Sequence, residues 1–277
     1  MVHGAAQLLT LQEAAEQLHV HYMTAYRWVR RGDLPAFKTG GRLRVRLDDL
    51  NRFLEERKLD VASAATATGQ TEWGRHVDRL TTMLLEGDAP ASWREVQKVI
   101  SDGATAGDTY VRLLLPAVIE IGARAEAATV STAVEHRARQ LVSTIVARLG
   151  ERFRRRGPAR GTAVCLTPPG EVHAIASAML ADFLVAAGYD VHHLGCGLTA
   201  DDLAEFLRDV PADVVGIAVT RHLPASCYSE MAAASRDGGH DVVVAFAGPC
   251  AHERSAAAVD AIAVREVHRL PALLAEG

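Results

Sequence analysis

Apolar residues change their spacing along the chain, and these changes divide it into three predicted regions and a linker. Residues 1–58 combine short helical stretches with a hairpin, and residues 72–155 repeat apolar positions at helical spacing. Residues 156–277 alternate short apolar strands with helices. Residues 59–71 are mainly small and show no periodicity, which is typical of a linker. The pattern predicts a multidomain protein.

The first region has the signals of a compact helix-turn-helix domain. Thr10-Leu11-Gln12-Glu13 fits a capping box that begins a short helix. A second helix is predicted over Tyr22–Arg31, where Gly32 ends it. Gly40-Gly41 joins two alternating runs, as in a β-hairpin, and a third helix is predicted from near Asp48. This order of elements predicts a winged helix-turn-helix.

The charge distribution indicates a partner for this region. The whole chain carries a net charge of -4, but residues 1–58 hold ten Lys/Arg and seven Asp/Glu, so this part is +3 and the remainder is -7. A basic head on an acidic body is typical of a module that binds a polyanion. Strand alternation places the three arginines of the hairpin on one face, opposite Leu43 and Val45.

Three motifs of this region resemble the DNA-binding domains of the excisionase and MerR types: Leu9–Ala15, Thr24–Trp28 and Gly32–Ala36. The resemblance implies double-stranded DNA as partner, with the second helix in the major groove. The residues expected to read bases are Tyr22, Met23, Tyr26 and Arg27. Those expected to contact phosphates are Arg30, Lys38, Arg42, Arg44 and Arg46. The alternative is a small helical domain whose arginines are merely solvated.

The second region is predicted to be a four-helix bundle, with helices over Trp73–Leu85, Pro90–Ile100, Asp108–Arg124 and Ser131–Leu149. Its Tyr110–Gly122 run resembles the helical domain that precedes many cobalamin-binding domains. Glu135-His136 matches the Glu-His pair of CarH-type cobalamin photoreceptor regulators, whose bundle covers the upper face of the corrin. The family's Trp falls on Ala125 and the following His on Glu126. The alternative for Glu135-His136 is a solvated pair on a helix.

Its alternation predicts that the third region is an α/β doubly wound parallel sheet of the Rossmann-like type, which by resemblance is of the cobalamin-binding kind. Its strands are expected at Thr162–Leu166, Asp190–Leu194, Asp213–Thr220 and Asp241–Phe246, separated by helices. Ligands of such sheets bind beyond the carboxyl ends of the strands. The loop after the first strand is therefore the candidate site.

This loop contains Gly170-Glu171-Val172-His173, which resembles the cobalamin-binding signature in the Glu-x-His form of CarH-like proteins. The resemblance implies that His173 is the lower cobalt ligand and that Glu171 orients its other ring nitrogen. Other positions depart from the family's pattern and make the site degenerate. Ala176 replaces a Gly, Ala218 and Thr220 stand where the family has Ser-x-Leu, and Phe246 stands at a Gly-Gly position, where its ring is expected to fill the cavity for the nucleotide tail.

Several classes of protein are excluded. No apolar run approaches the roughly 18 residues that span a bilayer, and the N-terminus lacks the features of a signal peptide. The four cysteines form no Cys-x-x-Cys pair, so neither a zinc knuckle nor a disulfide framework is indicated. A soluble cytoplasmic protein is expected.

These patterns predict a DNA-binding transcriptional regulator, not an enzyme. By resemblance to the CarH-like family, adenosylcobalamin and light set its oligomeric state, a dimer or tetramer, and its operator binding. An alternative keeps the DNA binding but gives the degenerate module another tetrapyrrole, such as haem, or no ligand. A further alternative is a corrinoid carrier of a methyltransferase system.

Overall fold

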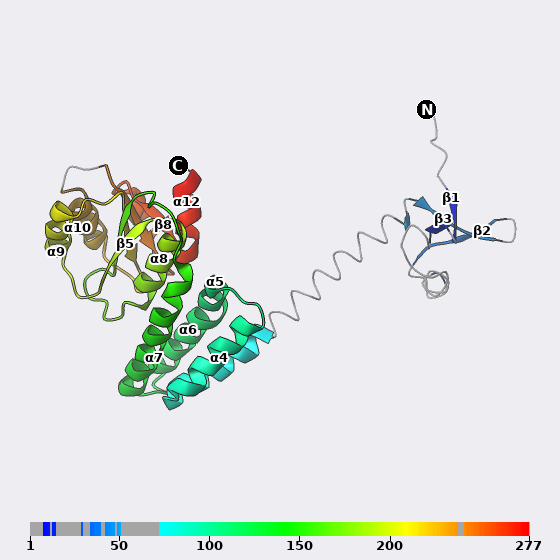
Figure 1. Ribbon diagram of the computed structural model, residues 1–277, viewed down its shortest axis with the longest axis horizontal. Coiled ribbons are helices and arrows are strands. Elements are labelled where there is room, and N and C mark those ends of the chain that lie inside the picture. The colour runs from blue at the N-terminus through cyan, green and yellow to red at the C-terminus, as the bar shows by residue number, and fades with distance from the viewer. Residues whose placement is uncertain are drawn as a thin grey trace. The chain divides into compact units, whose positions relative to one another are not determined.

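The computed structural model describes residues 8–11, 13–14, 29, 34–39, 42–47, 49–50, 72–237 and 241–276. The chain divides into two compact units, residues 1–72 and 73–277 (Figure 1). The division falls at the end of the predicted linker, residues 59–71, which lies outside the described residues. No helix in the described ranges is long and apolar enough to cross a membrane.

The first unit contains a three-stranded antiparallel sheet in the order β1-β3-β2. The strands are β1 (Leu8–Thr10), β2 (Phe37–Thr39) and β3 (Arg42–Arg46). The predicted hairpin is confirmed, whereas β1 was not predicted, because a run of three residues becomes a strand only through its pairing with β3. The capping box is also confirmed: Thr10 N–H donates to Glu13 Oε2 (2.7 Å) and Glu13 N–H donates to Thr10 Oγ1 (3.2 Å).

The alternation predicted for β3 is confirmed by its burial. Val45 is fully buried in a cluster with Leu9 and Leu50, and Leu43 packs against the same cluster. Arg46 is exposed, and its guanidinium lies 4.8 Å from the centre of the Phe37 ring. In β3, Leu43 and Val45 therefore face the core and Arg46 faces solvent.

The second unit begins with a helical bundle, whose long helices lie side by side in Figure 1. Its helices span residues 72–86, α4 (Ala89–Ser101), α5 (Ala106–Thr109), α6 (Leu115–Glu126) and α7 (Thr132–Gly150). The third predicted helix is interrupted by a π-helical turn, Tyr110–Leu114, in which Leu115 N–H donates to the carbonyl of Tyr110. Pro116 follows at once and has no N–H to donate, so it cannot maintain the regular α-helical hydrogen bonds at this point.

The bundle is followed by a parallel five-stranded sheet in the order β5-β4-β6-β7-β8. Its strands are β4 (Thr162–Leu166), β5 (Asp190–Gly195), β6 (Val214–Ala218), β7 (Val243–Ala247) and β8 (Ile262–Val264). The helices between and after them are α8 (Ile175–Ala186), α9 (Ala200–Asp209), α10 (Ala225–Arg236), α11 (Glu253–Ala257) and α12 (Leu270–Glu276). The doubly wound fold is confirmed, but β6 ends at Ala218 rather than Thr220 and the short β8 was missed.

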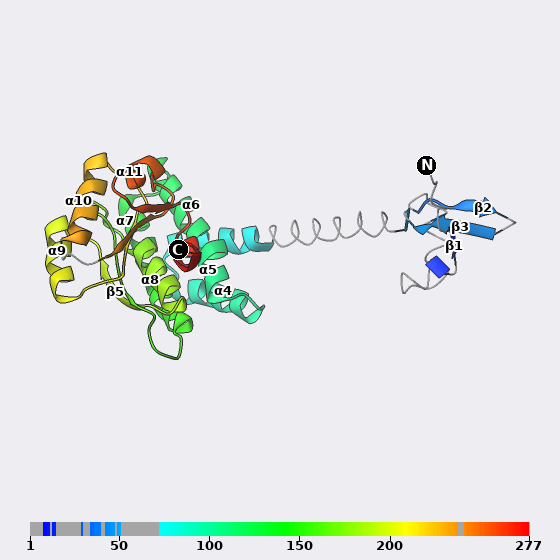
Figure 2. The ribbon, with the colours of Figure 1, turned by 90° about the horizontal axis from the view of Figure 1, so that it is seen from above.

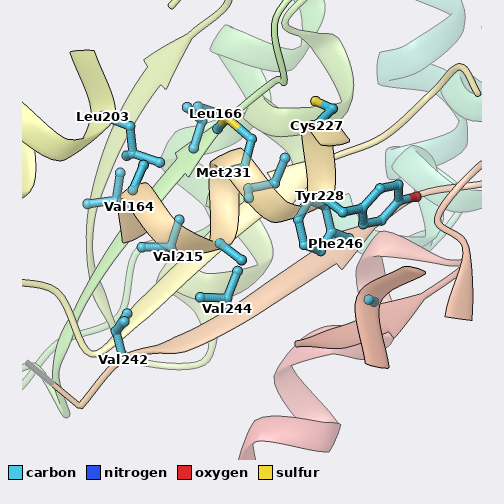
Figure 3. Packing of buried hydrophobic residues seen from close by; sticks show 14 of the residues in the cluster. Val164, Leu166, Leu203, Val215, Cys227, Tyr228, Met231, Val242, Val244 and Phe246 are labelled. Carbon is cyan, nitrogen blue, oxygen red and sulfur yellow. The ribbon is translucent and has the colours of Figure 1, made fainter. Parts of the chain in front are cut away.

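Helices cover both faces of this sheet (Figure 2). One face packs large side chains such as Val164, Val215 and Phe246 against α9 and α10 (Figure 3). The other face is built mainly from small residues, including Ala218 and Ala245, and packs against α8 and α12. Small side chains on this face allow the helices to approach the sheet closely.

The bundle and the sheet share one core, which explains why they form a single compact unit. Ile175 and Met179 of α8 are buried in the same cluster as the bundle residues. The Tyr110 O–H donates to Asp182 Oδ2 (2.6 Å), which ties the π-helical turn to α8. The position of the bundle against α8 places the start of α7 near the loop that precedes α8.

Candidate functional site

The candidate site lies at the carboxyl edge of the sheet, in the loop that joins β4 to α8. Gly170 adopts a φ of +84° there, a conformation that L side chains rarely take, and the chain then turns toward Glu171 and His173. Arg221, which follows β6, donates from its guanidinium to the carbonyl of Gly170 (2.8 Å). The loop is therefore held against the end of the neighbouring strand.

Glu171 is buried and bonds to Thr220 through both carboxylate oxygens. Its Oε1 accepts the backbone N–H of Thr220 (2.8 Å) and its Oε2 accepts the Thr220 hydroxyl (2.6 Å). The resemblance had implied a different partner, a ring nitrogen of His173. The structure differs because Thr220 offers two donors at the position where the family has Leu, and both point at the carboxylate.

His173 lies against the bundle, where its ring meets that of His136 edge to face with 5.0 Å between ring centres. His136 belongs to the start of α7, one residue after Glu135, whose Oε1 accepts from Arg139 Nε (2.9 Å). The structure thus brings Glu135 and His136 to the same place as His173, as the corrinoid resemblance implied. The sequence analysis missed Arg139, although its spacing of four residues from Glu135 on one helix was a usable signal.

The environment favours the neutral form of His173. Burial lowers the pKa of its imidazole below the ordinary value, and the neighbouring Arg139 and His136 lower this pKa further. The carboxylate of Glu135 raises the pKa of His173, but its effect is smaller than those of burial, Arg139 and His136. A neutral imidazole has a free ring nitrogen, which is the form that binds a metal ion.

The residue types at this junction suit a corrinoid, because His173 offers an imidazole. The distance between the rings of His136 and His173 is too short to admit one in this conformation. His173 would offer the cobalt ion of a corrinoid the free ring nitrogen of a neutral imidazole. Two aromatic rings with centres 5.0 Å apart are in direct contact, so a macrocycle does not fit between His136 and His173 in this conformation. Binding between the two modules requires these rings to separate.

Phe246 and Ala218 lie on opposite faces of the sheet. Phe246 is fully buried on the α10 side, where its ring centre lies 4.4 Å from that of Tyr228 (Figure 3). Ala218 is buried on the α8 side. The two positions therefore do not line one cavity, and the Phe246 ring serves as part of the hydrophobic core.

The other predicted site residues are only partly within the described chain. Tyr22, Met23, Tyr26, Arg27 and Arg30 lie outside it, and for Lys38 and Arg42 the description covers the backbone alone, in β2 and β3. Arg44 is half-buried and lies near Glu13, while Arg46 is exposed. Among the described residues, no group of three or more His, Cys, Asp or Glu side chains is arranged to hold a metal ion.

The hydrogen bonds between Thr220 and Glu171 predict a measurable loss of stability in Thr220→Val. The variant keeps the backbone N–H but removes the hydroxyl that donates to the buried carboxylate. Because a hydrogen bond to a charged group contributes about 1.5–3 kcal/mol, we expect the free energy of unfolding at neutral pH to fall by about that amount. Urea denaturation would measure it.

Thr144→Val is the matched control for this prediction. The Thr144 hydroxyl donates only to the carbonyl of Gln140 on an exposed part of α7, so its loss should change the stability by less than about 0.5 kcal/mol. If the two variants were equally stable, the Glu171–Thr220 hydrogen bond would not hold the loop as described.

Three segments of the chain match models of protein families. Residues 8–58 match a helix-turn-helix domain, and residues 77–149 and 161–274 each match a B12 binding domain. The protein thus combines a DNA-binding helix-turn-helix domain with a helical and a sheet B12-binding module. The same combination occurs in CarH-like regulators, so the resemblance drawn from the sequence is confirmed at the level of domains.

Three solved structures are similar to this chain, and the first of them supports its fold. The monomethylamine corrinoid protein of Methanosarcina barkeri is 15% identical with a TM-score of 0.62, over 73% of this chain and 97% of that chain. The methanol:cobalamin methyltransferase complex MtaBC from the same organism is 15% identical, with a TM-score of 0.40 over 73% and 79%. A cobalamin-binding protein from Desulfitobacterium hafniense DCB-2 is 16% identical, with a TM-score of 0.36 over 72% and 97%. No curated protein sequence matches the chain.

Proposed function

We propose that this protein is a transcriptional regulator in which a cobalamin-type cofactor, bound between the bundle and the sheet, controls oligomeric state and operator binding. The observation that carries the proposal is the junction of His136 and His173 between two B12-binding modules in a chain that also has a helix-turn-helix domain. This proposal has three further parts. The cofactor is adenosylcobalamin, light also controls the oligomeric state, and the protein has no enzymatic activity.

Each residue of the junction has a role in this proposal. His173 would hold the corrinoid through its imidazole, and the bound group would supply the cobalt ion. Burial together with Arg139 and His136 keeps that imidazole neutral. Glu171 bonds to Thr220 and thereby fixes the loop that carries His173.

Separation of His136 from His173 provides the coupling to assembly. The two rings join the start of α7 to the loop before α8, so a ligand that enters between them would displace the start of α7 from this loop. A ligand shifts an assembly equilibrium only by its different affinities for the two states. The bundle surface that changes position would then differ in its affinity for a second copy of the chain.

A second candidate function is a corrinoid carrier, which the fold of the monomethylamine corrinoid protein favours for residues outside the head. The basic winged helix-turn-helix domain favours the regulator, because a corrinoid carrier does not need to bind DNA. Another tetrapyrrole, such as haem, or no ligand remains the alternative for the sheet module.

The regulator would be tested by gel filtration and by DNA binding. Both would be measured with and without adenosylcobalamin, in the dark and after illumination. Unchanged size and DNA affinity upon stoichiometric cofactor binding would favour the carrier.

The arginines of the head are expected to divide between reading sequence and binding phosphate. Arg27→Ala should reduce the preference for operator over random DNA, whereas Arg44→Ala should weaken binding to both and lower its salt dependence by about 1 in the slope of log K against log salt. Fluorescence anisotropy with labelled duplexes would measure both effects. If both substitutions affected specific and random DNA equally, this division of roles would be wrong.

A further inference from the structure

The ten residues that join the bundle to the sheet carry a dense positive charge. Residues 151–160 (ERFRRRGPAR) hold five arginines and one glutamate, a net charge of +4. Because residues 59–277 total -7, the body without this segment is -11. The five arginines, which we call the arginine loop, are all exposed: Arg152, Arg154, Arg155, Arg156 and Arg160.

The core of the second unit holds the arginine loop in place. Phe153 is buried between the rings of Tyr110 and Phe183, with ring centres 4.9 and 5.5 Å away. Arg155 donates to the carbonyl of Ala186 (3.2 Å), and the Arg160 guanidinium lies 5.0 Å from the centre of the Tyr189 ring. The guanidinium groups are therefore displayed from an anchored segment.

A groove of about 620 Å³ runs along this segment and is lined by four of its arginines together with Tyr189 and Asp190. Arg154 pairs with Glu151 (Nη2 to Oε1, 2.9 Å). Within residues 72–237 and 241–276, neither Arg152 nor Arg156 forms a salt bridge. Planar guanidinium groups bind phosphate oxygens through two parallel hydrogen bonds, and the loop uses arginine exclusively where lysine would give only a point charge.

We propose that the arginine loop binds the phosphate backbone of double-stranded DNA, as a second contact in addition to the helix-turn-helix head. This inference rests on the proposed DNA-binding function. A duplex attracted by the +3 head is repelled by an acidic body, unless the body approaches it through a basic face. The arginine loop supplies such a face and reads no sequence, because phosphates are the same at every base pair.

The salt dependence of binding to random DNA tests this contact. The full chain would be titrated onto a labelled 30-base-pair duplex of random sequence at several NaCl concentrations, as wild type and as Arg152→Gln/Arg156→Gln. Since each phosphate contact contributes about 0.9 to the slope of log K against log salt, the double variant should have a slope shallower by about 1.8. The control is Arg94→Gln/Arg254→Gln, which removes the same charge from exposed positions on α4 and α11 and should retain the wild-type slope.

The remaining outcomes separate this inference from the function on which it rests. Equal slopes for the two double variants would overturn the loop contact, while a lower slope for Arg44→Ala in the same assay would show that the head still binds DNA. If Arg152→Gln/Arg156→Gln kept the wild-type slope but formed less oligomer in gel filtration, the loop would bind the acidic surface of a second copy. This result would also overturn the proposal. No binding by the wild-type chain would overturn both.

Discussion

His173→Ala is expected to abolish stoichiometric binding of adenosylcobalamin. Wild-type protein titrated in the dark should give a bound absorption spectrum that saturates at one cofactor per chain, and the variant should give the spectrum of the free cofactor. Loss of a residue that only orients a metal ligand typically costs about 10- to 100-fold in affinity, so loss of the imidazole itself should cost more. The position of His173, half-buried and kept neutral at the module junction, is the physical basis.

The control for this prediction is His222→Ala. His222 is exposed in the loop after β6, at the same edge of the sheet, and should leave the titration unchanged. A wild-type spectrum in His173→Ala would show that the imidazole is not the cobalt ligand. If wild-type protein also gave only the free-cofactor spectrum, the cobalamin part of the proposed function would fail, and a DNA-binding protein with another ligand or none would remain.

Phe246→Ala is expected to reduce the free energy of unfolding by about 3–5 kcal/mol. The ring is fully buried and packs against Tyr228, so its removal loses transfer free energy and leaves a cavity under α10. With a denaturant dependence of about 1–3 kcal/mol per molar urea, this corresponds to a midpoint lower by one to several molar. Circular dichroism at 222 nm during urea denaturation would measure it.

Leu273→Ala, at a site 40% exposed on α12, serves as the control for the same measurement and should cost less than about 1 kcal/mol. A loss in Phe246→Ala no larger than that of the control would contradict a close-packed core on the α10 side. It would restore the sequence-based interpretation, in which the ring fills a cavity intended for a ligand.

Local signals predicted most of the architecture. The capping box at Thr10 joins residues only three positions apart, and the hairpin follows from Gly40-Gly41 and the alternation on both sides. The helical spacing of the bundle and the strand–helix alternation also depend on neighbours in sequence. The short strands β1 and β8 gave no such signal, because three residues become a strand only when a partner strand pairs with them.

The candidate site shows the same division. The sequence by itself predicted the candidate site residues His173, Glu171 and His136, because these positions resemble family motifs. Only the tertiary structure decided their partners: Glu171 bonds to Thr220, 49 residues away, and His173 contacts His136 across the module junction. It also decided that Phe246 faces α10, since the face that a strand residue occupies depends on the register of the whole sheet. Contacts between distant segments depend on how the helices and strands pack together, and the spacing of residues along the chain does not show this.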